Sequence, residues 1–170
     1  MYFEESLSRE PETREKALAW LVVALDRSLQ KVANIPEKRQ EYESQLNRWL
    51  EEVRANPKAM AFLVDILDEH SVNSQSAARL LARLGPDASK ALLNAYRTKP
   101  EEQAVILDIF RQIGPSILPA LQEAVRSNDD LTNREKMLLV RLIGEVGGES
   151  AVAFLREIRK QPSDRRRGPP

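Results

Sequence analysis

The sequence predicts an all-α fold: a right-handed α-solenoid of about three to four stacked helical hairpins with an N-terminal helical pair. A similar segment occurs in three copies between residues 77 and 160, and each copy places a glycine between two stretches with apolar residues at helical spacing. The chain is also 42% hydrophobic and 31% charged with only 5% aromatic residues, a composition typical of helices with densely charged outer faces. Each copy is therefore expected to form one pair of packed helices.

Two helices are expected before the repeats. Residues 11–32 carry an apolar stripe at helical spacing, formed by Leu18, Leu21, Val22, Leu25, Leu29 and Val32. A second helix is expected to begin at Pro36, because proline is well tolerated in the first turn of a helix. We expect residues 1–56 to cap one end of the stack.

Trp20 and Val23 lie off the main stripe and widen the apolar face of the first helix. Two explanations stay open for them. Either they make further core contacts, against Phe3 or the second helix, or they contact a second copy of the chain or another partner. The chain is accordingly expected to be a monomer, or a homodimer through its N-terminal helices.

Residues 57–160 are predicted to hold the repeats. The three clearest copies are residues 80–97, 109–126 and 142–159. Their turn glycines, Gly85, Gly114 and Gly147, are 29 and 33 residues apart, which is the spacing of a two-helix repeat. Each glycine is expected to take the left-handed conformation that ends a helix, and the proline after the first two is expected to begin the next helix.

Two further features fit this arrangement. A degenerate fourth copy is expected over residues 49–67, where Ala55 stands in place of the turn glycine. Before the third copy, Thr132 and Glu135 have the spacing of a capping box, so a helix is expected to start there.

The pattern resembles the HEAT-repeat family of armadillo-type α-solenoids. The resemblance rests on the turns Gly85-Pro86 and Gly114-Pro115 and on the small apolar run that includes Ala77 and Ala78. It implies an extended concave surface, which second helices line in HEAT-like stacks and which holds a partner. A fold of this kind does not by itself identify a function.

One set of charges follows the register of the repeat, because an arginine lies twelve residues after each turn glycine. The predicted partner-binding residues are these three arginines with two neighbours: Lys90, Arg97, Arg126, Arg156 and Arg159. Guanidinium groups in a row would suit carboxylates or phosphates. The alternative is structural, because each of the three arginines also lies near the end of its helix, where the dipole favours a cation and acids such as Glu123 or Glu157 are within reach.

No catalytic, cofactor-binding or metal-binding residues are expected, and the chain is not expected to be an enzyme. The sequence has no cysteine, and its one histidine, His70, lies where a helix should end and where the dipole favours a cation. A net charge of zero argues against general binding to nucleic acids or membranes. The sequence shows no secretory signal and no apolar run long enough to span a membrane, so we expect a cytoplasmic protein.

The function expected from the sequence is that of a non-catalytic scaffold or adaptor that binds another protein through an acidic segment. Two other classes stay open, a HEAT-like protein that binds nucleic acid and a HEAT-like protein similar to phycobilin lyases. Residues 161–170 contain three prolines and three consecutive arginines, so we expect a disordered tail or a linker within a longer protein.

Overall fold

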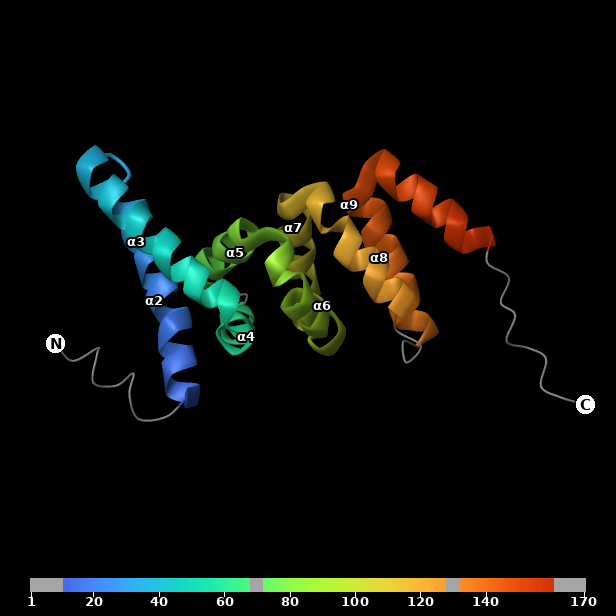
Figure 1. Cartoon of the computed structure of the whole chain (residues 1–170), viewed down its shortest axis with the longest axis horizontal. Coiled ribbons are helices and arrows are strands. Elements are labelled where there is room, and N and C mark those ends of the chain that lie inside the picture. Colours follow the sequence, from blue (N-terminus) through green and yellow to red (C-terminus); the bar gives the residue numbers. More distant parts are fainter. Residues whose placement is uncertain (1–10, 68–71, 128–131, 161–170) are drawn as a thin grey trace, which may run out of the picture. The chain divides into compact units, whose positions relative to one another are not determined.

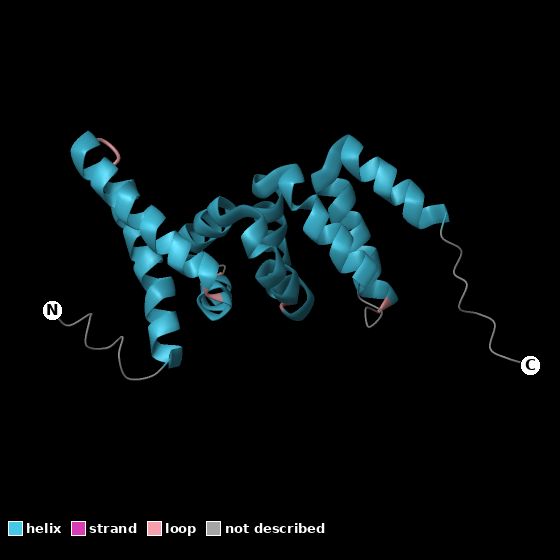
Figure 2. Cartoon of the chain, viewed as in Figure 1, coloured by secondary structure: helices cyan, strands magenta, loops and turns pink. Residues whose placement is uncertain are grey.

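The computed structural model describes residues 11–67, 72–127 and 132–160, and they are helical almost throughout (Figures 1 and 2). Helix accounts for 93% of them, and no strand occurs among them. The all-α prediction is confirmed. Phe3, His70 and the predicted tail at residues 161–170 lie outside the described residues.

The chain divides into two compact units, Met1–Gln112 and Ile113–Pro170. The boundary falls at the end of the first helix of the second repeat copy, next to Gly114.

The first unit begins with two long helices, α2 (Pro11–Lys31) and α3 (Pro36–Ala55). Both begin at a proline, which confirms the predicted starts. In Figure 1, α2 and α3 run side by side, and α2 also packs against the next two helices, α4 (Pro57–Asp65) and α5 (Val72–Leu84). The first helix therefore contacts three other elements and forms a large part of the core of this unit.

The turn between α3 and α4 needs no glycine. Asn56 has an extended backbone (φ −120°, ψ 99°), and its side-chain oxygen accepts hydrogen bonds from the backbone N–H groups of Lys58 and Ala59. Pro57 then occupies the first turn of α4, where its missing N–H costs nothing. The other copies turn at a glycine, and Ala55 stands in its place here. The turn is made instead by Asn56, which caps the start of α4.

The rest of the first unit follows the first repeat copy. After α5 come a short 3-10 helix η1 (Gly85–Ala88), α6 (Ser89–Thr98), η2 (Pro100–Glu102) and α7 (Gln103–Ile113), whose last residue belongs to the second unit. Gly85 has a φ of 62°, as predicted for the turn glycine. The rings of Tyr96 and Phe110 pack edge to face with centroids 6.5 Å apart, which joins α6 to α7.

The second unit contains η3 (Gly114–Ile117), α8 (Leu118–Ser127) and α9 (Asn133–Lys160). Gly114 has a φ of 71° and makes the predicted turn. The predicted capping box is confirmed, because Glu135 N donates to Thr132 Oγ1 at 3.3 Å and Thr132 N donates to Glu135 Oε2 at 2.8 Å. Helix α8 packs against α9.

The third turn differs from the prediction by one residue. Helix α9 is broken at Gly148 (φ 50°, ψ −134°), whereas Gly147 was expected to take the left-handed conformation. Gly147 is needed for another reason: a Cβ added there would lie 2.6 Å from the Cβ of Ala151 and 2.7 Å from Cδ2 of Leu118. The glycine pair thus combines a close approach to α8 at the first position with a break in the helix at the second.

The buried positions of the first helices nevertheless share one register relative to Gly85, Gly114 and Gly147. The residues eight, five and four before Gly85, Gly114 and Gly147 are all 2% exposed or less: Ala77, Leu80 and Leu81; Ile106, Ile109 and Phe110; Leu139, Leu142 and Ile143. Side chains at this spacing lie on one face of a helix. The repeat seen in the sequence is therefore a repeat of core positions.

One segment of the described residues, Pro100–Arg126, is long and apolar enough to cross a membrane by length and composition. It is not one helix, because α7 ends at Ile113 and Gly114 turns the backbone with a φ of 71°. Within it, Ile106, Ile109 and Phe110 are fully buried. These side chains are accounted for by the packing of the protein itself.

Candidate partner-binding surface

The five predicted partner-binding residues lie on second helices of the repeats and are all exposed: Lys90 and Arg97 on α6, Arg126 on α8, and Arg156 and Arg159 on the part of α9 that follows Gly148. Exposure is what a contact with a partner requires. Arg97 belongs to the first unit and Arg126 and Arg159 to the second, so a single row of all three stays a prediction.

Arg126 already has partners within its unit. Its Nη2 donates to Glu157 Oε2 at 3.1 Å and to Oε1 at 3.4 Å, and its guanidinium lies 5.0 Å from the ring centre of Phe154. Arg126 and Glu157 are both about half exposed, so the ion pair contributes less than about 1 kcal/mol. If the arginines only stabilise helix ends, Arg126 is expected to pair with an acid such as Glu157, and this pair is present. An acidic partner would have to compete with Glu157 for Arg126.

Trp20 and Val23 separate in the structure. Trp20 is 48% exposed, whereas Val23 is 1% exposed and belongs to the core. The expected oligomer contact therefore needs correction at Val23, whose side chain is covered by its own unit. Phe3, the other residue expected against Trp20, lies outside the described residues.

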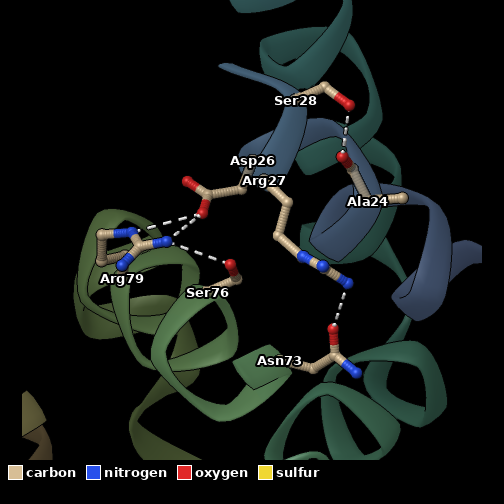
Figure 3. Close-up of polar contacts among 7 residues, drawn as sticks. All are labelled: Ala24, Asp26, Arg27, Ser28, Asn73, Ser76 and Arg79. Carbon is tan, nitrogen blue, oxygen red and sulfur yellow. Dashed lines mark hydrogen bonds and ion pairs between the residues drawn. The ribbon is translucent and has the colours of Figure 1, made fainter. Parts of the chain in front are cut away.

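A polar cluster that the sequence analysis missed joins α2 to α5 (Figure 3). Asp26 is 5% exposed, and its Oδ2 accepts hydrogen bonds from Arg79 Nη2 at 2.6 Å and Arg79 Nε at 3.2 Å. Arg79 Nη2 also donates to Ser76 Oγ at 3.0 Å. Next to this pair, Arg27 Nη1 donates to Asn73 Oδ1 at 3.0 Å, as Figure 3 shows.

The position of Asp26 follows from helical spacing. It lies seven, four and three residues after Ala19, Val22 and Val23, which are each 1% exposed or less, so it is on the buried face of α2. A charged residue at such a position was the signal available in the sequence. A single oxygen of Asp26 accepts both guanidinium hydrogen bonds, so the cluster ties α2 to α5.

A second cluster lies where α6 ends. Lys99 Nζ is 2.7 Å from Asp65 Oδ1 on α4 and 3.5 Å from Glu102 Oε1 on η2. Partial burial alone would lower the pKa of Lys99, but the hydrogen bonds and negative charges of Asp65 and Glu102 outweigh it and raise this pKa. Burial also raises the pKa of Glu102 despite the opposing effect of Lys99. Among the described residues, Glu102 Oε2 has no hydrogen-bond partner.

Replacing Glu102 by glutamine is therefore expected to stabilise the protein at neutral pH by about 1 kcal/mol or less. The folded state raises the pKa of Glu102, so it disfavours the charged form, and wild type loses stability as the pH rises from the ordinary value of 4.5 through the raised one. Chemical denaturation of both proteins from pH 4 to 7 measures this. The advantage of the variant should be near zero at pH 4 and largest at pH 7. A less stable variant at pH 7 would show that attraction to Lys99 outweighs burial.

The described residues contain no group of three or more histidine, aspartate or glutamate side chains that could hold a metal ion. What the described side chains offer instead is a set of exposed cations on second helices, together with ion pairs that join neighbouring helices within each unit. No protein-family model, no curated protein and no solved structure matches the chain.

Proposed function

We propose that the chain is a HEAT-like α-solenoid that acts as a non-catalytic scaffold and binds an acidic segment of another protein. The observation that carries the proposal is that Lys90, Arg97, Arg126, Arg156 and Arg159 are all exposed on second helices of the repeats. In a solenoid, these helices line an extended surface.

Contacts within the first unit support the stacking of hairpins. First helices of successive copies contact each other, since Arg83 Nη2 on α5 donates to Asn47 Oδ1 on α3 at 2.6 Å. Second helices also contact each other, because Lys99 at the end of α6 pairs with Asp65 on α4. Contacts between like helices of neighbouring hairpins are the contacts that a stack requires.

The second unit offers the same kind of support. Arg126 on α8 contacts Glu157 and Phe154 on the part of α9 after Gly148. These are the second helices of the second and third copies. Each unit therefore contains at least one contact between second helices.

An acidic partner is favoured over a neutral one by the chemistry of the exposed cations. The charge of the whole chain is zero, so attraction of an acidic segment depends on where the cations are and not on their number. Arginine also matches the two oxygens of a carboxylate with two parallel donors.

The test is the binding of a short labelled polyglutamate peptide, measured by fluorescence anisotropy at low salt. The triple variant Arg97→Glu, Arg126→Glu and Arg159→Glu is expected to lose affinity by about tenfold or more. A matched control carries the same charge change at exposed sites on first helices, Lys38→Glu, Arg39→Glu and Arg134→Glu. The control should bind the peptide with affinity close to that of wild type.

Two results would overturn the proposal. The first is equal loss of affinity in both triple variants, which would mean attraction to the net charge of the chain and not to the second helices. The second is binding of wild type to double-stranded DNA of similar length with higher affinity than to the peptide, which would favour the nucleic-acid alternative.

A further inference from the structure

Glu149, Val152, Ala153 and Arg156 form an exposed stripe on the part of α9 after Gly148, which we call the α9 stripe. All four residues are exposed, and Val152 is 43% exposed. At helical spacing they lie opposite Ala151 and Phe154, which are 1% and 4% exposed and face the core. The helix therefore presents a short apolar centre with an acid at one end and a base at the other.

The two charged residues of the α9 stripe have no hydrogen-bond or ion-pair partner within the described part of the chain. None of the hydrogen bonds or ion pairs among the described residues involves Glu149 or Arg156. The helix dipole favours an acid in the first turn and a base near the end, which accounts for their signs. It does not account for an exposed valine between them.

The α9 stripe is complementary to itself. If two copies lie antiparallel with a two-fold axis between positions 152 and 153, Glu149 of each copy faces Arg156 of the other. In the same arrangement Val152 of each copy meets Ala153 of the other, and the small alanine allows the helices to approach closely. A two-fold axis makes both charge contacts at once from one surface, as in isologous dimers.

We propose that the α9 stripe is the contact through which two copies of this chain form an antiparallel homodimer. The stripe covers about two turns of one helix, so the interface is small and the association weak, in the micromolar range or weaker. The proposal does not rest on the proposed function. In this dimer Arg156 contacts Glu149 of the other copy, so only Lys90, Arg97, Arg126 and Arg159 of the predicted partner-binding residues stay open to an acidic segment.

Charge reversal at the two ends of the stripe tests the pairing. In Glu149→Arg both charge contacts of the homodimer become Arg against Arg, and in Arg156→Glu both become Glu against Glu. Sedimentation velocity over a range of concentrations should show that each variant alone dimerises about tenfold or more weakly than wild type. The double variant Glu149→Arg with Arg156→Glu should regain wild-type dimerisation.

An equimolar mixture of the two single variants gives the sharpest result. One copy then has arginine at both positions and the other has glutamate at both, so the heterodimer has two attractive contacts. The mixture is expected to dimerise at least as well as wild type, although neither component does so alone. Raising the salt concentration should weaken this heterodimer, because its charges are exposed.

Two controls separate the pairing from effects on the helix or on net charge. Ser150→Arg places a new cation in the same first turn of the helix but off the stripe, and Lys38→Glu makes the same charge change as Arg156→Glu on α3. Both should dimerise as wild type does. Circular dichroism of each variant checks that the helices are intact.

The outcomes that overturn the proposal are clear. Wild type that stays monomeric at all concentrations contradicts it, and so does a dimer that persists equally in both single variants. A dimer lost in Trp20→Ala but kept in both charge variants would place the contact on α2 instead.

Discussion

Arg79→Met is expected to lower the free energy of unfolding by about 3 kcal/mol. The variant removes the cation that donates both hydrogen bonds to Asp26, while the carboxylate stays on the buried face of α2 at 5% exposure. A buried charge without a partner costs far more than the pair contributes. Urea denaturation followed by circular dichroism at 222 nm measures the difference.

A double variant separates the cause from a loss of packing. The double variant Asp26→Leu with Arg79→Met should recover stability to within about 1 kcal/mol of wild type, since neither charge remains. A double variant as unstable as the single one would show that the geometry of the pair, and not its charge, stabilises the contact between α2 and α5.

Gly147→Ala is expected to lower the free energy of unfolding by about 2 kcal/mol, although alanine is the better helix former. The added Cβ would lie 2.6 Å from the Cβ of Ala151, which is fixed to the backbone, and 2.7 Å from Cδ2 of Leu118. The methyl group of Leu118 can move, but the contact with Ala151 cannot relax without a shift of the helix.

Gly144→Ala is the matched control on the same helix. A Cβ there would meet only Cδ1 of Leu155, at 3.9 Å, an ordinary van der Waals distance. This variant is expected to be more stable than wild type by up to about 1 kcal/mol. Thermal unfolding of the two variants should therefore shift in opposite directions, and a shift in the same direction would contradict the close approach at Gly147.

Helix starts and core positions were the part of the fold that the sequence could predict. Pro11 and Pro36 begin helices, and Thr132 and Glu135 form the capping box. These signals are local, because each depends on the backbone of a few neighbouring residues. The buried positions before Gly85 and Gly114 were predictable for a similar reason, since apolar side chains at helical spacing share one face.

The third turn and the buried ion pair depended on contacts that the sequence does not display. Gly147 lies too close to Leu118 of α8 for a Cβ, while Gly148 takes the positive φ, and a glycine pair in a sequence does not show which glycine has which role. Likewise, the partner of Asp26 is 53 residues away, on α5. Helical spacing is enough to place Asp26 on a buried face, but it does not show which cation reaches it.

For the candidate site, the sequence predicted the type of residue and the helices that carry it, but not how the side chains are arranged. The five cations are exposed on second helices, and Arg126 pairs with Glu157 as the structural alternative expected. Val23, grouped with Trp20 because both lie off the main stripe, is covered because α2 contacts three elements and not one. The width of a buried face depends on the number of neighbouring helices, which a single amphipathic pattern does not give.

The conformation of Gly148 also sets the direction of the last helical segment. Both sides of this residue are good helical sequence, so if its backbone took ordinary helical angles, residues 133–160 would form one straight rod. In a rod, Phe154 and Glu157 would be carried away from Arg126 of α8, and the ring contact and the ion pair that join them would be lost. The backbone angles of this one glycine therefore hold the last segment against its own chain.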